Sequence, residues 1–183
     1  MSALKKMLDK YRGLERVALR VGIMGAKTYP DGTPVAFVGY INEYGYKGTV
    51  PERTQTIYHS VNQDGSFKKG GQFVKKATAN FARTVTVPSH TIEIPSRPFF
   101  RSAISEERAN IKNMAASLLS KHDPETALRL VGEHMVGALS DSVQTWSEPP
   151  NAPSTIRQKG YNAPLRANDK LLRNSFSYEI EEK

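Results

Sequence analysis

The four histidines are the first candidates for chemistry, because imidazole binds metals and transfers protons near neutral pH. His59, His90, His122 and His134 lie far apart, and no two of them have the spacing of a zinc ligand pair. His134 directly follows Glu133, but adjacent residues of a helix point to different faces. We therefore expect no metal site and no cofactor.

Motifs for nucleophiles and phosphates are not found either. No serine lies in a Gly-x-Ser-x-Gly elbow, and neither of the two common glycine-rich phosphate motifs occurs. Gly70 and Gly71 lie among lysines, and the Asp-Gly pairs at 31–32 and 64–65 are turn formers. The chain also has no cysteine. We expect a protein that is not an enzyme.

The charge balance leaves one binding function open. The chain of 183 residues has a formal net charge of +8. Between Gly65 and Ile92 the chain has five lysines and arginines and no aspartate or glutamate. A basic surface attracts nucleic acid, and it also keeps a protein soluble. A basic nucleic-acid-binding module is therefore our alternative hypothesis, with an interface made by Lys68, Lys69, Lys75, Lys76 and Arg83.

Hydrophobic periodicity divides the first part of the chain into short elements. Apolar residues from Leu4 to Ala18 recur at helical spacing, and residues 17–23 then alternate as in a half-buried strand. Thr33 as a cap followed by Pro34 predicts a helix start, and Gly45 predicts its end. The segment between them is predicted to be a short helix, although its apolar run would also fit a buried strand.

Residues 47–94 indicate a β-rich hairpin arm inserted into the fold, because β-branched runs alternate there with glycine and asparagine turn signals. Phe67, Phe73 and Phe81 are interleaved with the lysines of this arm. These rings could stack on bases or anchor the arm in a neighbouring molecule. We favour the neighbour, because the apolar face of a hairpin needs a cover.

The second part of the chain predicts two long helices and a terminal strand. One helix extends from about residue 96 to 121, and Asp123 with Pro124 begins a second that continues to Trp146. So short a link predicts an antiparallel pair. Residues 147–166 form a Pro-rich loop with a helical candidate at 155–159. A short helix at 171–172 and a strand at 176–180 follow. The stripe facing the core in the first long helix is predicted to be Phe100, Ile104, Ile111, Ala115 and Leu118.

These elements predict an α+β fold, with a small mixed or antiparallel sheet packed on the long helix pair. Residues 1–183 are expected to form a single domain that carries the arm and the Pro-rich loop. The aromatic residues at apolar positions or element ends are expected in the core, namely Tyr40, Tyr44, Phe99, Phe100 and Trp146.

Three stretches together resemble tail-completion and neck proteins of tailed bacteriophages. They are VAFVGYINEYG, IPSRPFFRSAI and WSEPPNAPSTIRQKGYNAPLRANDKLLRNSFSYEI. The shared motifs are Glu-x-Gly at 43–45, Ile-Pro-x-Arg-Pro-Phe at 94–99, Pro-Asn-x-Pro-Ser-Thr at 150–155 and Leu-x-x-Ser at 172–175. Residues 167–171 depart from the Thr-Gly-x-Leu element of such proteins, so we expect that turn to differ. The basic hairpin resembles an optional insertion.

The resemblance implies a small virion protein, assembled in the host cytoplasm, that forms a ring at the head–tail junction or completes the tail tube. Its expected partners are copies of itself, six in a ring, and head–tail connector, tail terminator or tail tube proteins. The basic arm would allow non-specific contact with packaged DNA, and no membrane contact is expected. The residues assigned to the structural junction are Arg97, Pro98, Phe99 and Phe100, and those assigned to the assembly loop are Pro150, Asn151, Pro153, Ser154 and Thr155.

Overall fold

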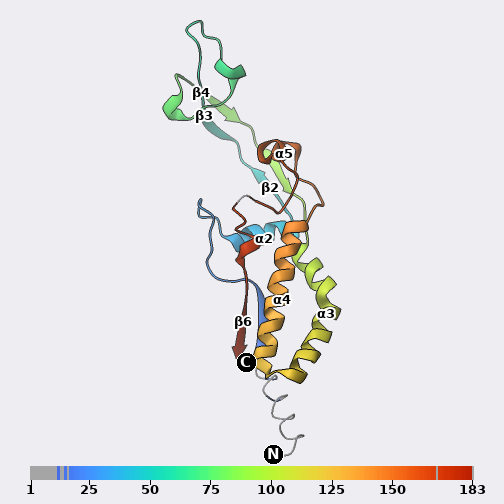
Figure 1. Ribbon diagram of the computed structural model, residues 1–183. Helices are drawn as coiled ribbons and strands as arrows, with labels where there is room; N and C mark the ends of the chain where they lie inside the picture. The colour runs from blue at the N-terminus through green and yellow to red at the C-terminus, as the bar shows by residue number, and fades with distance from the viewer. Residues whose placement is uncertain (1–11, 13–14, 16, 168, 183) are drawn as a thin grey trace, which may run out of the picture. The chain divides into compact units, whose positions relative to one another are not determined.

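A computed structural model describes residues 12, 15, 17–167 and 169–182 of the chain (Figure 1). The helix expected over the first residues therefore lies almost wholly outside the described residues. The chain divides into two compact units, residues 1–46 with 94–183 and residues 47–93. Whether the two units fold as a single domain stays a prediction, and each unit is described by itself.

The first unit is a two-stranded antiparallel sheet packed on a pair of long helices (Figure 1). Val17 lies opposite Glu182 and Ile23 lies opposite Phe176 in this sheet. The helix α4 contacts both strands and also packs against α3, so the predicted α+β class is confirmed. The elements are β1 (Val17–Ile23), α2 (Val35–Tyr44), α3 (Phe99–Lys121), α4 (Pro124–Thr145), α5 (Pro153–Lys159) and β6 (Phe176–Glu182).

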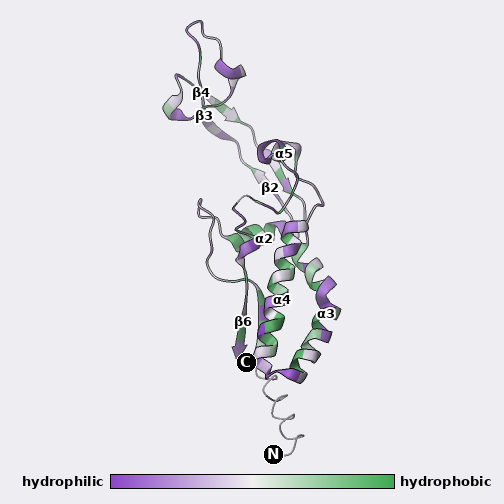
Figure 2. Ribbon diagram, in the orientation of Figure 1, coloured by the Kyte–Doolittle hydropathy of each residue, from purple (hydrophilic) through white to green (hydrophobic). Residues whose placement is uncertain are grey.

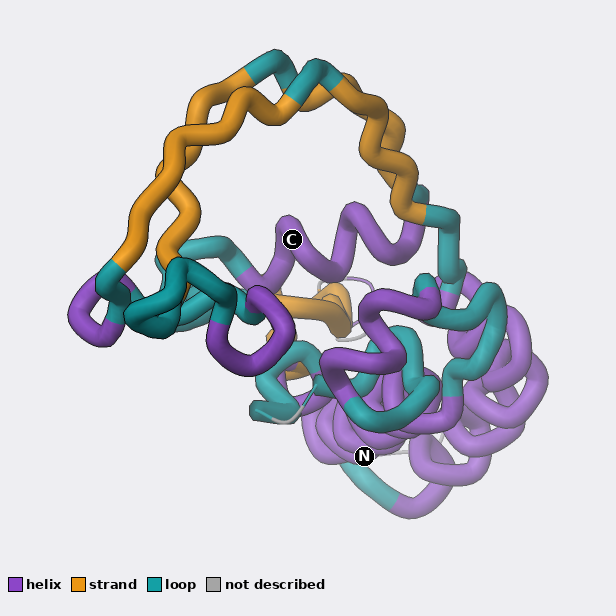
Figure 3. The backbone as a smooth tube through the Cα atoms, turned by 90° about the horizontal axis from the view of Figure 1, so that it is seen from above, coloured by secondary structure: helices purple, strands orange, loops and turns teal. Residues whose placement is uncertain are grey.

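The second unit is a long two-stranded ribbon, referred to below as the arm. Strand β2 (Tyr46–Val50) pairs with β5 (His90–Ile94), and β3 (Arg53–His59) pairs antiparallel with β4 (Phe81–Val87). Figure 3 shows that the ribbon bends between these two pairs. Pro51 and Pro88 lie at this bend, where proline cannot donate a ladder hydrogen bond.

Local signals placed most elements correctly, with small differences at their ends. The predicted cap of α4 is confirmed, since the Asp123 carboxylate accepts the backbone N–H of Thr126 at 2.9 Å. Pro34 occupies the cap position of α2 itself, one residue later than predicted, and the cap makes no side-chain hydrogen bond. The helix expected at 171–172 is wrong, because those residues form a turn before a 3-10 turn at Arg173–Ser175.

The core gathers side chains from every layer of the first unit. Phe99, at the first residue of α3, is only 1% exposed, and its ring lies 6.3 Å from that of Phe176 in β6. The Pro-rich loop is ordered against this core, because Leu165 from the loop is buried in it. The predicted stripe of α3 is wrong at Ile104, which is exposed, whereas Phe100 is partly buried and packs against the core; Ala103 is buried instead of Ile104. The core cluster consists of Val35, Phe99, Ala103, Leu139, Val143, Leu165, Leu172 and Phe176.

The contact between α4 and β6 requires a glycine. A Cβ added at Gly132 would lie 2.6 Å from Cγ of Tyr178, near the base of that side chain. Gly132→Ala should therefore lower the free energy of unfolding by about 1 to 3 kcal/mol, as overpacking does, in urea denaturation. Gly137→Ala on the same helix is the matched control. A Cβ there meets nothing within 4 Å, so higher helix propensity should stabilise the protein by about 0.5 to 1 kcal/mol.

Candidate functional site

Glu43 is a buried carboxylate at the end of α2 that caps the start of α3. Its oxygens accept the backbone N–H of Phe100 at 2.9 Å, the backbone N–H of Arg101 at 3.2 Å and the Nε–H of Arg101 at 2.7 Å. The first N–H groups of a helix lack partners within the helix and carry partial positive charge, so a carboxylate binds them well. Glu43 therefore fixes the direction in which α3 begins.

Arg97 is a second buried charge beside it. Its guanidinium donates to the carbonyl oxygen of Pro149 at 3.1 Å, to that of Pro150 at 3.4 Å and to Oδ1 of Asn42 at 3.2 Å. All three acceptors are uncharged, and burial lowers the pKa of Arg97 from its ordinary value. The planar guanidinium, with donors pointing in several directions, thus fastens the end of α2 to the Pro-rich loop.

Backbone contacts complete this junction. The N–H of Arg97 donates to the carbonyl oxygen of Asn42 at 2.6 Å, and the hydroxyl of Ser96 donates to that of Glu43 at 2.7 Å. Gly45 ends α2 with φ +77°, and a Cβ there would lie 2.9 Å from the carbonyl oxygen of Ile94. Only glycine combines this backbone conformation with so close an approach.

The structure brings the three stretches that carry the resemblance together at this junction. Pro98 is the cap residue of α3, Phe99 enters the core and Phe100 is partly buried. In the loop, the N–H of the buried Asn151 donates to Oδ1 of Asn162 at 3.0 Å. The others lie nearer the surface: Pro150, Pro153 and Ser154 are exposed and Thr155 is partly buried. The buried residues of the motifs hold the first unit together. The exposed residues Pro150, Pro153 and Ser154 are accessible to a partner.

Exposed aromatic rings on α2 and at the first residue of β2 were missed by the sequence analysis. Phe37 is 53% exposed, Tyr40 62%, Tyr44 56% and Tyr46, the next residue after Gly45, 50%. We call these four residues the aromatic face. The expectation that Tyr40 and Tyr44 lie in the core is wrong: their rings contact each other at 4.8 Å, and the Arg101 guanidinium lies 5.0 Å above that of Tyr44. Tyrosine, phenylalanine and arginine are the residues enriched in protein interfaces.

The spacing in α2 contained a signal for this face. Val35, Gly39 and Glu43 are buried on one side, and Phe37, Tyr40 and Tyr44 follow one another on another side. A helix that is apolar around most of its circumference needs partners on more than one side. Figure 2 shows this hydrophobic character along α2. The sequence alone does not tell which of the two apolar sides of the helix faces the core.

The arm carries the basic residues of the sequence prediction. Lys68, Lys69, Lys75 and Lys76 lie in or beside the two 3-10 turns of its tip, residues 59–81, and Arg83 follows in β4. All five are exposed. Counted over residues 47–93, seven lysines and arginines face three acidic residues, which gives the arm a net charge of +4.

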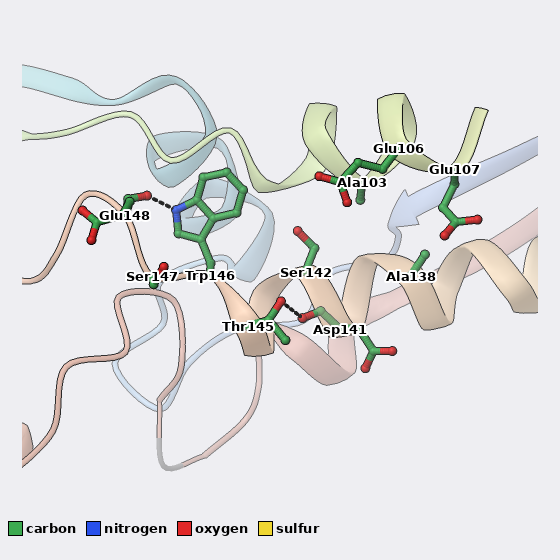
Figure 4. Close-up of a pocket in the computed structure, with 10 residues that line it drawn as sticks. All are labelled: Ala103, Glu106, Glu107, Ala138, Asp141, Ser142, Thr145, Trp146, Ser147 and Glu148. Atoms are coloured by element: carbon green, nitrogen blue, oxygen red, sulfur yellow. Dashed lines mark hydrogen bonds between the residues drawn. The ribbon is translucent and has the colours of Figure 1, made fainter. Parts of the chain in front are cut away.

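A groove of the first unit lies between α3 and the end of α4, with a volume of about 440 Å³ (Figure 4). Its carboxylates do not converge on one point: Glu106, Asp141 and Glu148 point in different directions. The carboxylate of Glu107 accepts a hydrogen bond from His134 at 2.7 Å, and that hydrogen bond lowers the pKa of Glu107. The groove is lined by acidic side chains, by the Trp146 indole and by hydroxyl groups, and the hydroxyls of Ser142 and Thr145 donate to backbone carbonyl oxygens.

No three histidine, aspartate or glutamate side chains among residues 12, 15, 17–167 and 169–182 are grouped so that they could hold a metal ion. No described helix combines the length and the apolar character needed to cross a bilayer. Comparison with protein families, with curated proteins and with solved structures found no match.

Proposed function

We propose that this chain is a structural protein of a tailed bacteriophage or prophage, which assembles into a ring at the head–tail junction or at the end of the tail tube. The observation that carries the proposal is the aromatic face, because four large rings at least half exposed on one short segment are unfavourable in an isolated molecule. The resemblance of the junction motifs to tail-completion and neck proteins supports the same function. A ring of six copies in the virion, without catalysis, is the form we propose.

The face has the composition of an interface centre. Truncation of a tyrosine or arginine at such a centre commonly weakens binding by about 2 kcal/mol or more. Arg101 over Tyr44 is half-exposed and bound to Glu43, so the face has a fixed cation at its edge. A repeated contact between this face and a different surface of the next copy would close into a ring when the rotation permits.

Removal of the two exposed tyrosines tests the proposal. Tyr40→Ala with Tyr44→Ala should weaken self-association by several hundredfold, because each ring is expected to contribute about 2 kcal/mol of binding. Light scattering across concentration, followed by negative-stain imaging of large species, measures the effect. The stability of the monomer should change little, since both rings are exposed.

The control is Leu130→Ala, which removes an apolar side chain 36% exposed on α4, outside the aromatic face. This variant should assemble like the wild type. A wild type that is monomeric at every concentration, with and without tail tubes, would contradict the assembly function. If both variants lost assembly equally, the aromatic face would have no specific part in assembly.

A second candidate function, nucleic-acid binding, is favoured by the arm. Its net charge of +4 is half of the charge of the whole chain, although it contains about a quarter of the residues. Released counterions make such a surface bind phosphates, and this binding weakens steeply with salt. The two functions are compatible, because a ring can present its basic arms to DNA.

A further inference from the structure

We infer that the arm tip binds duplex DNA, with Lys68, Lys69, Lys75 and Lys76 on the phosphates and the Phe73 ring as a wedge against one base step. The inference deepens the second candidate function and rests on it. It concerns the ligand and the contacts of the arm, and it does not depend on how copies of the chain associate.

The tip has a small core of its own, and this changes the role expected for its aromatic residues. His59 is buried, and its ring lies 4.9 Å from that of Phe67, 5.2 Å from that of Phe73 and 6.5 Å from that of Phe81. The rings of Phe67 and Phe81 also contact each other at 6.0 Å. Part of the apolar cover that we expected from a neighbour is therefore supplied within the arm, by contacts of Phe67 and Phe81 with each other and with His59.

Phe73 differs from the other two rings because it is 71% exposed, against 46% for Phe67 and 41% for Phe81. Its backbone is nevertheless held in place, since it forms a bridge to His59. A single projecting ring with paired lysines before and after it suits an unstacked base step between two phosphate backbones. Proteins that bend DNA commonly insert such apolar wedges.

Hydrogen bonds preorganise the tip that presents these groups. The side chain of Asn80 donates to the carbonyl oxygen of Val61 at 2.9 Å and accepts its N–H at 2.7 Å. The N–H of Lys68 donates to the carbonyl oxygen of Ser60 at 2.8 Å. Less conformational entropy is lost on binding when the contact groups are already fixed.

The rest of the arm fits a duplex better than an acidic protein surface. A two-stranded β-ribbon has the width that a DNA groove admits. On one face of the ribbon Thr54 lies opposite Thr86 and Thr56 lies opposite Thr84, which are neutral hydroxyl groups suited to phosphate or sugar oxygens. No acidic residue interrupts the chain from Gly65 to Ile92, and Asp64 is the single acidic residue of the tip, so the positive charge of the tip is largely uncompensated by its own sequence.

The charge test compares two variants that lose the same four units of net charge. Fluorescence anisotropy of a labelled 20-base-pair duplex is measured at several salt concentrations, with a single strand of the same sequence as competitor. If four lysines contact phosphates, the wild-type slope of log K against log salt should be about −3.6. Lys75→Glu with Lys76→Glu should reduce its magnitude by about 2, whereas Lys112→Glu with Lys121→Glu, exposed on α3, should leave it nearly unchanged.

The wedge test uses 2-aminopurine placed in the duplex, whose fluorescence rises when its base is unstacked. The wild type should raise the signal several-fold, and Phe73→Ala should abolish the rise while the salt slope is kept. Proton resonances of the His59 ring report whether the tip still folds around Phe67 and Phe81 in this variant.

Each contrary outcome has a separate meaning. Equal slopes for the two lysine pairs, or tighter binding of the single strand than of the duplex, would overturn the duplex-binding tip. Normal slopes with no fluorescence change in the wild type would overturn the wedge alone and leave the second candidate function intact. Loss of self-association in Lys75→Glu with Lys76→Glu at unchanged DNA affinity would assign the tip to a protein partner instead.

Discussion

Replacing Phe99 with alanine should lower the free energy of unfolding by about 3 to 5 kcal/mol, the usual cost of removing a buried phenylalanine. The ring is 1% exposed and contacts both Phe100 and Phe176, so its loss leaves a cavity between α3 and β6. The surroundings cannot collapse easily, because the Ser142 hydroxyl holds the carbonyl oxygen of Phe99 at 2.9 Å. Urea denaturation followed by circular dichroism measures this change.

Phe100→Ala is the matched control, one residue further along the same helix. Phe100 is only partly buried, and its N–H remains bound to Glu43 whatever the side chain. We expect a cost clearly smaller than that of Phe99→Ala, about 1 to 2 kcal/mol for partial loss of apolar burial. Equal costs for the two variants would mean that the core is centred elsewhere on α3.

This pair also marks the limit of periodicity. The repeat of apolar residues predicted a helix here, and the structure confirms it as α3. Two adjacent phenylalanines at the start of a helix, however, fit the same repeat with the stripe shifted by one position. The stripe was wrong at Ile104 for this reason, since tertiary packing buries Phe99 and Ala103 most deeply and leaves Phe100 partly buried.

The strands and the helix pair were predictable because their signals are local. The alternation in β1 and β6, the proline and aspartate at the start of α4 and the short link after α3 each depend on a few neighbouring residues. The pairing of β1 with β6 joins the two ends of the described chain, and no local signal contains that information.

The junction was less predictable, because its hydrogen bonds cross long distances in sequence. Glu43 binds the N–H of Phe100, and Arg97 binds carbonyl groups of Pro149 and Pro150. Nothing in the spacing of these residues shows that a lone carboxylate and a lone guanidinium have partners in other segments. The resemblance pointed to these motifs, and the contacts give them a physical reason: they satisfy buried charges.

Glu43→Ala should lower the free energy of unfolding by about 3 to 6 kcal/mol. The variant removes the acceptor of two backbone N–H groups at the start of α3, and hydrogen bonds to a charged partner each contribute about 1.5 to 3 kcal/mol. The lost ion pair adds little to this cost, because the side chain of Arg101 is 57% exposed and can return to water. Thermal and urea denaturation should agree on the size of the effect.

Arg101→Ala separates the cap from the ion pair. It removes the guanidinium from the buried Glu43 carboxylate but keeps both backbone donors, and because the Arg101 side chain is itself 57% exposed the cost should be about 1 kcal/mol. Glu43→Gln should fall between the two alanine variants, since a carboxamide has one oxygen to accept with and no charge for the helix start. If Arg101→Ala cost as much as Glu43→Ala, the ion pair and not the helix cap would hold the junction, and α3 would begin where it does for another reason.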